Sequence, residues 1–520
     1  MFSSCNVVVS SCKVLLGAKD GSSSQEAPSG QNADRSGRPG CRARQGGFSA
    51  RPLWQPPELL ASRVHAILPA ATTGHDVRGL LEWTLDEESI AALFQEHAST
   101  QYERELTLFA MVYLLIQVAA GVRASVFAAY QADQSSSQPH LTVSYQALYG
   151  KLKRTDLAVP EALVRATAAK MRPVAEQLPP QSNNLLPGYR LRILDGNMLA
   201  GTDRRLKVLR RWAAACLPGK SLVVYEPAWG LATDLVLCED AYTQERTLLL
   251  HILPRTQADD LWIADRGFCT AKFLQGVARR QGFFVVREHK QSLRWQAVSP
   301  MKRAGSNPDG AIWEQRVRII NPESGEIVLA RRVELRLHQP TRNGDRVIAV
   351  FTNLPAQVSA KKILQLYRER WTVENHFQFL TDALHCELTG LGAPRAALCM
   401  FAMALLAGNA LAVVRAALRA AHGADKESMV SGYYLADEVA GDYRALMKLM
   451  PAPGWAPWRN LAADQLTCLL QVIAAYVPMA ALQKHPRGPK KPREKMTYNK
   501  KRLHVSTARL LKDEKTEDTC

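Results

Sequence analysis

After Pro187, patterns typical of β-strands alternate with patterns typical of helices, and this alternation limits the possible folds more than any other feature of the chain. Strand patterns lie at 189–197, 220–240 (two strands around a turn), 260–268 and 283–289, and helix patterns lie at 245–253 and 271–281. Strands and helices in this order predict an α/β sheet.

Residues 290–350 differ, because strand patterns follow one another there with no helix pattern between them. They predict a small antiparallel β-domain inserted into an α/β core made of residues 183–289 and 351–482. Within the second part of that core, the segment 359–385 predicts one long amphipathic helix. Further helices are expected as far as about Leu482.

Residues 76–182 carry helix patterns and predict a helical domain ahead of the core. One short helix is expected in the segment 143–154, with four apolar or aromatic residues on one face and three bases at its end: Tyr145, Leu148, Tyr149, Leu152, Lys151, Lys153 and Arg154. Such a helix is typical of the DNA-reading helix of a helix-turn-helix, but a solvated amphipathic helix fits equally well. The first reading would make residues 76–182 a DNA-binding domain.

The charge of the chain indicates a polyanionic partner. Sixty-six Lys and Arg against forty-eight Asp and Glu leave a net charge of +18. Nucleic acid is the first candidate, and an anionic membrane surface is the second. The tail 483–520 is basic, with eleven Lys or Arg and one acid, Glu494, between Lys484 and Lys512. Residues 1–75 are rich in Ser, Gly, Gln, Pro and Arg and predict a disordered, low-complexity N-terminus.

Cysteine usage and hydropathy indicate a cytoplasmic protein without a membrane partner. The ten cysteines form no CxxC pair and no His/Cys cluster at zinc spacing, which is typical of reduced thiols. Three uncharged stretches, Thr107–Val122, Ala396–Val414 and Gln465–Gln483, are interrupted by polar residues or Gly, or are mostly Ala. They are expected to be buried helices of a large core rather than membrane spans.

Two aspartates occupy equivalent places in the expected sheet. Asp195 and Asp265 each follow an apolar strand and precede a turn that contains glycine. Rigid carboxylates at such positions can hold two divalent metal ions about 3.5–4 Å apart, as phosphodiester cleavage requires. Taken singly, Asp-Gly and Asp-x-Gly after a strand are also common turn chemistry.

A third carboxylate lies on the expected helix 359–385. Tyr367, Arg370 and Glu374 are spaced three and four positions apart and share one stripe of that helix. Glu374 would lie where the apolar face meets solvent, in reach of two strand-end aspartates. Arg370 would hold a DNA phosphate or steady the carboxylate. A solvated helix face with an Arg/Glu pair is the alternative.

These three segments resemble the conserved blocks of DDE-type bacterial insertion-sequence transposases. Tyr367-x2-Arg370-x3-Glu374 is similar to the Tyr-Arg-Glu-Lys signature of that group, and LDGN around Asp195 and IADRGF around Asp265 are similar to its two aspartate blocks. The order matches across roughly residues 90–510. One position departs, because Thr381 stands where the signature has its Lys. In the group this Lys helps to grip DNA, so its loss puts full activity in doubt unless a nearby base replaces it.

The resemblance implies an RNase H-like core whose two Mg²⁺ or Mn²⁺ ions are held by Asp195, Asp265 and Glu374. Water would cleave the transposon end, and the freed 3′-hydroxyl would then attack target DNA. It also implies a homodimer on double-stranded DNA in the bacterial cytoplasm, associated with the nucleoid. Candidate DNA contacts are Tyr367, Arg370, Arg204, Arg205, Lys207, Arg210 and Arg211, with Trp295 or Trp313 as a stacking platform for a flipped base.

Two other functions fit the same residues. A metal-dependent nuclease of this fold would use the three carboxylates without joining strands. A catalytically impaired DNA-binding relic would explain Thr381, although the three carboxylates argue against decay.

Overall fold

The computed structural model describes residues 73–99, 104–136, 139–182, 186–203, 205–207, 210, 216–289, 293–341, 344–450, 452–485 and 488. The chain separates into two units, Met1–Gln483 and Lys484–Cys520, and every helix and strand reported below belongs to the first. The expectations for the low-complexity N-terminus up to residue 72, and for nearly all of the basic tail, lie outside the described residues. So do those for Arg204 and Arg211.

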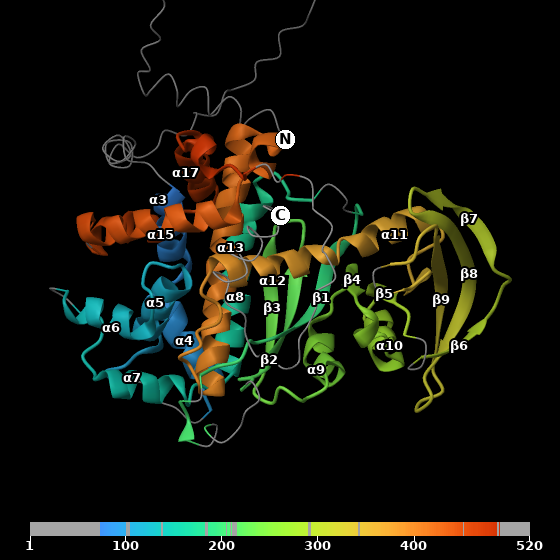
Figure 1. Ribbon diagram of the computed structural model, residues 1–520, viewed down its shortest axis with the longest axis horizontal. Helices are drawn as coiled ribbons and strands as arrows, with labels where there is room; N and C mark the ends of the chain where they lie inside the picture. Colours follow the sequence, from blue (N-terminus) through green and yellow to red (C-terminus); the bar gives the residue numbers. More distant parts are fainter. Residues whose placement is uncertain are drawn as a thin grey trace, which may run out of the picture. The chain divides into compact units, whose positions relative to one another are not determined.

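A mixed sheet with helices on both faces forms the middle of the molecule, as the alternation predicts (Figure 1). Its strands are β1 (Arg190–Met198), β2 (Lys220–Glu226), β3 (Leu231–Cys238), β4 (Asp260–Ala264), β5 (Phe283–Arg287), β6 (Arg294–Ala297), β7 (Lys302–Asn307), β8 (Gly310–Ile320), β9 (Ile327–Leu337) and β10 (Val347–Thr352). The order is β3-β2-β1-β4-β5-β10-β9-β8-β6, with β7 paired to β8. β1, β4 and β5 are parallel neighbours, and every other pairing is antiparallel.

Successive residues of the central strands pack into two hydrophobic cores, one on each face of the sheet. Trp262 of β4 packs in a cluster with α9 (Glu245–Ile252) and α10 (Ala271–Arg279), whereas Ile263 packs with α11 (Ala360–Arg368) on the opposite face. Residues 261–264 of β4 are all apolar, as expected for a strand that is covered on both faces. Short 3₁₀ turns follow α9 (Leu253–Arg255) and β4 (Arg266–Phe268).

The strands expected in an inserted β-domain continue the same sheet. β10 pairs antiparallel with β5 on one side and with β9 on the other, so Val350 lies opposite both Arg287 and Val333. The boundary expected at residue 350 therefore falls inside a strand. The hydrophobic pattern predicts the antiparallel strands correctly, but it does not show that β10 would extend the core sheet through them.

The N-terminal helices share one hydrophobic core with the C-terminal helices. They are α3 (Thr73–Thr84), α4 (Glu87–His97), α5 (Leu108–Ala119), α6 (Val126–Gln134), α7 (Tyr145–Leu152) and α8 (Ala158–Glu176). Their partners are α13 (Pro394–His422), α14 (Ala424–Ser428), α15 (Gly432–Leu449), α16 (Ala456–Arg459) and α17 (Ala463–Ala475), with 3₁₀ turns at Ala452–Trp455 and Met479–Leu482. α3 contacts α15, and α5 and α8 contact α13. Residues 73–182 are thus part of a larger helical layer.

Among the described residues, α13 is the one helix long and apolar enough to cross a membrane by length and composition alone. In its most apolar window, 94% of the residues are buried inside the protein. It packs against α8, α5, α17 and strand β3. This packing agrees with the expectation that the uncharged stretches form core helices.

Candidate active site

Asp195 and Asp265 lie side by side at one edge of the sheet. The parallel pairing of β1 with β4 ends at Leu194 opposite Ala264, so the two aspartates are the next residues on adjacent strands. The sequence placed Asp195 at the end of its strand, but β1 continues to Met198 because β2 pairs with it antiparallel up to that residue. Asp265 does end its strand, and its Oδ1 accepts a hydrogen bond from the Gly267 amide at 2.7 Å.

The surroundings of Asp195 disfavour its charge. Its side chain is only 16% exposed. Burial raises the pKa of Asp195 to about 7, and the negative charges of Asp265 and Glu374 act in the same direction. The Arg370 guanidinium, whose Nη1 lies 3.3 Å from Oδ2, and the Gly196 amide, which donates to Oδ1 at 3.0 Å, act against this rise.

Arg370 joins the first and third carboxylates. Its Nη1 also lies 2.6 Å from Oε1 of Glu374, whose side chain is 47% exposed. The guanidinium therefore bridges Asp195 and Glu374 from a half-buried position. The Arg370 Nε is buried with no hydrogen-bond partner among the described residues. This arrangement supports the expectation that Arg370 steadies a carboxylate.

The helix that carries these residues is interrupted, contrary to the expectation of one long helix. α11 ends at Arg368 and α12 (Trp371–Ala383) begins three residues later, although the two run nearly in line in Figure 1. The Glu369 and Arg370 amides bond to carbonyls three residues back, at 3.0 and 3.2 Å. Glu369 is buried at this point, where its carboxylate accepts a hydrogen bond from Ser182 at 3.2 Å. A tightened turn thus sets the direction of Arg370.

The donor set has the chemistry that Mg²⁺ and Mn²⁺ prefer, since Asp195, Asp265 and Glu374 all offer carboxylate oxygens. Their mutual repulsion at Asp195 is the electrostatic condition that a cation relieves. Within the described residues, however, no three His, Cys, Asp or Glu side chains are close enough to hold one ion together. Arg370 supplies the positive charge between Asp195 and Glu374 instead.

A fourth carboxylate, Glu245, lies against Gly196 and close enough to Asp265 to raise its own pKa, and it was missed from the sequence. A Cβ placed on Gly196 would lie 2.5 Å from the Glu245 carboxyl carbon. Burial raises the pKa of Glu245, with Lys220 lowering it and Asp265 raising it. The sequence predicts Gly196 as a turn residue, but in the structure this glycine lies in β1 and leaves room for Glu245, the first residue of α9. No local sequence motif around Glu245 predicts this contact.

A cavity of about 480 Å³ lies beside Arg266, the residue after Asp265, and was not predicted from the sequence. Three arginines, three acids, one histidine and two apolar residues line it: Arg266, Arg287, Arg332, Glu288, Glu334, Asp345, His289, Val347 and Ala349. Arg287 pairs with Asp345 at 2.7 Å, and Arg332 pairs with Glu288 at 2.7 Å. These pairs fix the arginine side chains around the opening.

Both tryptophans predicted to stack on a flipped base, Trp295 and Trp313, already contact other side chains of the protein. Trp295 is half-buried, with its ring 6.0 Å from that of Phe351 and the Arg332 guanidinium 5.1 Å from its centroid. Trp313 lies under Arg336 at 4.4 Å. Trp371, directly after Arg370, is instead 61% exposed. With Tyr367 it lines a cavity of about 740 Å³.

The predicted phosphate contacts divide into surface and buried groups. Arg205, Lys207 and Arg210 are exposed, and Arg205 lies 3.4 Å from Asp203. Lys151 of α7 is buried, because its ammonium donates to the Leu106 carbonyl and lies 4.9 Å from the Phe94 ring centroid. The expectation that Lys151 is one of the terminal bases of a DNA-reading helix is therefore wrong. The exposed bases at the end of α7 are Lys153 and Arg154.

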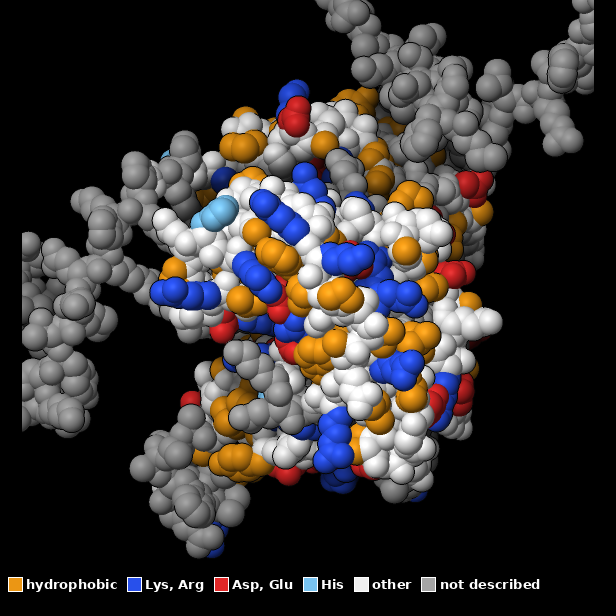
Figure 2. All heavy atoms as spheres, turned by 90° about the vertical axis from the view of Figure 1, so that its right-hand side faces the viewer, with side chains coloured by type: hydrophobic (Ala, Val, Ile, Leu, Met, Phe, Trp, Pro, Cys, Tyr) orange, Lys and Arg blue, Asp and Glu red, His pale blue; other side chains and the backbone are white. Residues whose placement is uncertain are grey.

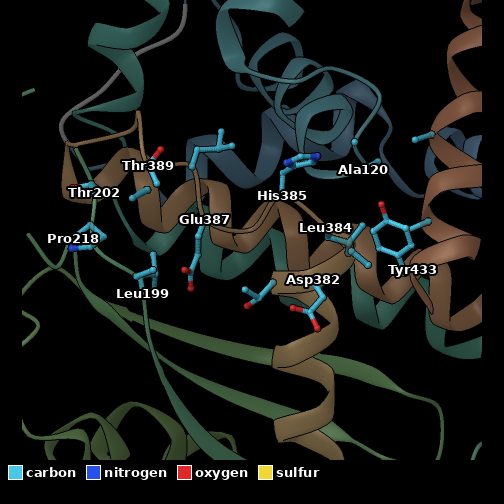
Figure 3. Close-up of a pocket in the computed structure, with 18 of the residues that line it drawn as sticks. Ala120, Leu199, Thr202, Pro218, Asp382, Leu384, His385, Glu387, Thr389 and Tyr433 are labelled. Carbon is cyan, nitrogen blue, oxygen red and sulfur yellow. The ribbon is translucent and has the colours of Figure 1, made fainter. Parts of the chain in front are cut away.

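Thr381, at the position of the missing Lys, lines an acidic cavity of about 380 Å³. Figure 3 shows two of the acids of this cavity, Asp382 and Glu387. Its hydroxyl donates to the Phe377 carbonyl at 3.1 Å. The described lining includes Asp382, Glu387 and Asp437 together with His385, but no Lys or Arg. The described part of this cavity therefore offers no substitute base.

Comparison with known proteins agrees with the blocks identified here. Residues 189–410 match the model of the family described as "Transposase DDE domain", a segment that contains Asp195, Asp265 and Glu374. This match supports a DDE-type transposase. No curated protein sequence matches the chain. One similar solved structure is the "piggyBac transposase synaptic complex with hairpin DNA", at 9% identity and a TM-score of 0.37, covering 79% of this chain and 87% of that chain.

Proposed function

We propose that this protein is a DNA transposase that cleaves the ends of its element and joins them to target DNA. The observation that carries the proposal is the adjacency of Asp195 and Asp265 on parallel strands, with Glu374 linked to Asp195 through Arg370. All of these residues fall inside the segment that matches the transposase DDE domain. The proposal includes a bacterial insertion sequence as the source of the gene.

The proposed core is RNase H-like. Supporting it, β3, β2 and β1 are antiparallel to one another, and β4 and β5 continue parallel to β1, in the order β3-β2-β1-β4-β5. This order brings the carboxyl ends of β1 and β4 to one edge. Residues on adjacent strands are held rigidly there while their oxygens still reach the substrate.

Asp195, Asp265 and Glu374 would hold two Mg²⁺ or Mn²⁺ ions, which supply water activation and stabilisation of the leaving oxygen. Arg370 offsets part of the negative charge of Asp195 and Glu374 in the DNA-free protein. A backbone phosphate entering the site would compete for the same guanidinium, because Arg forms strong paired hydrogen bonds with phosphate as well as with carboxylate. Such competition would release Glu374 when DNA is present. The partner is double-stranded DNA, bound by a homodimer in the bacterial cytoplasm.

The test is Mg²⁺-dependent cleavage of the DNA that flanks the gene, by wild type, Glu374→Gln and the control Asp382→Asn. Asp382 is an exposed acid on the same helix, so its variant removes one equal charge. We expect wild type and the control to nick the element ends, and Glu374→Gln to bind them with at least about 100-fold slower cleavage. Equal cleavage by all three proteins would contradict the assignment.

A strand-joining assay separates the two competing functions. Cleavage without joining would indicate a nuclease. Binding without cleavage by wild type would indicate an impaired relic. Thr381, whose surroundings include no Lys or Arg among the described lining residues, favours the relic more than any other residue. In that case Thr381→Lys is the variant to test for recovered cleavage.

A further inference from the structure

One face of the antiparallel strands carries arginines where the opposite face carries core residues. On β8, Arg316 and Arg318 are exposed, whereas Val317 and Ile319 are fully buried. The buried pair packs in the cluster that contains α10. Since successive side chains of a strand point to opposite faces, both arginines face solvent on the side away from that cluster.

The neighbouring strands extend this face. Arg318 is paired with Leu329 of β9 and with Gln296 of β6, and Arg294 of β6 is paired with Ile320. Residues directly opposite in an antiparallel pair project to the same side. Arg294, Arg316, Arg318, Ile327 and Leu329 therefore form one surface, which we name the outer sheet face. Leu329 is 62% exposed and Ile327 is 51% exposed.

The three arginines of the outer sheet face differ from most other arginines of the antiparallel strands. Arg331, Arg332 and Arg336 all lie within ion-pair distance of glutamates. In the described part of the chain, no carboxylate lies within ion-pair distance of Arg294, Arg316 or Arg318. Figure 2, which faces this end of the molecule, shows Lys and Arg side chains spread among apolar ones.

The positive charge of the outer sheet face favours DNA over a second copy of the chain as its binding partner. In a two-fold symmetric dimer the same patch meets itself, so a second copy would bring these arginines against one another. DNA has the opposite charge along its whole length, and its phosphates take up arginine side chains that lack acidic partners. The exposed Ile327 and Leu329 of β9, beside the arginines of β8, can contact the sugar backbone.

The outer sheet face is separate from the catalytic edge. Counting along the sheet, β8 is five strands away from β1, or about 24 Å at the usual spacing of about 4.8 Å. That distance corresponds to about seven base pairs of a duplex at about 3.4 Å each. A duplex bound at Asp195 and Asp265 would therefore reach this face if it extended about seven base pairs beyond the cleavage point.

We propose that the outer sheet face is a second DNA-binding surface, which holds the phosphate backbone of a duplex away from the cleavage point. The proposal rests on the proposed function in one respect, since it takes double-stranded DNA as the substrate. The contacts are to phosphate and sugar, so they add affinity without sequence preference.

The test compares the salt dependence of binding to a 40-base-pair duplex, without added divalent metal, for wild type, Arg318→Gln, Arg316→Gln/Arg318→Gln and Arg279→Gln. Arg279 is the matched control, because it is an exposed arginine near the same strands that is already paired with Glu326. We expect the slope of log affinity against log salt to fall by about one for Arg318→Gln and about two for the double variant. The control slope should equal that of wild type.

Three outcomes would overturn the proposal. An unchanged slope in a double variant with wild-type circular dichroism and melting temperature would show that no phosphate lies on the face. A changed sedimentation coefficient with an unchanged slope would assign the face to a second copy of the chain. Because binding is measured without cleavage, a catalytically inactive wild type leaves this result standing. Wild type that binds no DNA would overturn both proposals.

Discussion

Asp195 is a buried carboxyl with Asp265 and Glu374 close by. These surroundings make its ionisation costly, and they also make it a suitable ligand for a cation. Its pKa rises to about 7 because the side chain is buried and because Asp265 and Glu374 repel its charge. Arg370 offsets part of that penalty. A cation bound beside Asp195 would relieve the repulsion between the carboxylates, which is one of the causes of the raised pKa.

The first prediction concerns the stability of Asp195→Asn in metal-free buffer. The folded protein binds the Asp195 proton more tightly than the unfolded chain, whose Asp pKa is about 3.8. Stability therefore falls as pH rises through this window, and the full cost is present above pH 7. We expect Asp195→Asn to be more stable than wild type at pH 8 by up to about 4 kcal/mol, and the gain to shrink by half or more at pH 5.

Urea unfolding in EDTA at pH 5, 6.5 and 8 measures this gain. Asp382→Asn, which changes an exposed acid, should show no such pH dependence. A gain for Asp195→Asn that is the same at all three pH values would mean that the stability change comes from packing rather than from ionisation.

At the scale of elements, one buried amide ties the longest helix to the sheet. Asn409 of α13 is fully buried, and its Oδ1 accepts from the Ala232 amide at 2.7 Å while its Nδ2 donates to the Ala232 carbonyl at 2.9 Å. Both partners are backbone groups of β3. The Asn409 side chain of this mostly apolar helix thus provides hydrogen-bond partners for the buried N–H and C=O of Ala232.

The second prediction is that Asn409→Leu destabilises the protein by about 2–4 kcal/mol. Leu has the same number and branching of side-chain heavy atoms, but it leaves the two Ala232 backbone groups buried without these partners. The free energy of unfolding in urea measures the loss. Gln378→Leu on the exposed part of α12 serves as the control and should change stability by less than about 0.5 kcal/mol. A neutral Asn409→Leu would mean that water or another group replaces the amide.

At the scale of the whole molecule, segments far apart in sequence hold the helical layer together. α3 packs against α15 and α16, and Arg459 of α16 pairs with Glu82 of α3 at 2.7 Å. The unit made of residues up to Gln483 is closed by these contacts, whereas Lys484–Cys520 belong to a separate unit. All of these packing contacts lie within the first unit.

The third prediction is that removal of residues 486–520 leaves the melting temperature within about 2 °C of wild type. The same truncation should weaken non-specific DNA binding and reduce its salt dependence, because most of the eleven bases between Lys484 and Lys512 are lost. Differential scanning calorimetry and binding at two salt concentrations measure the two effects. A large fall in melting temperature would show that the segment packs on the first unit.

The amino-acid sequence by itself determined the alternation of strands and helices, the place of Asp265 after an apolar strand and the spacing of Tyr367, Arg370 and Glu374. These features depend on periodicity and spacing along the chain, which tertiary contacts change little. The break at Glu369 in the predicted helix escaped the sequence analysis, because burial of that side chain beside Ser182 is a long-range contact.

Only the tertiary structure decided which residues became neighbours. It paired β1 with β4 so that Asp195 and Asp265 are adjacent, placed Glu245 against Gly196, and buried Lys151 under Phe94. It also joined the antiparallel strands to the core through β10. Strand pairing and burial depend on residues distant in the chain, so no local pattern encodes them, and the environment that raises the pKa of Asp195 exists only once the sheet has formed.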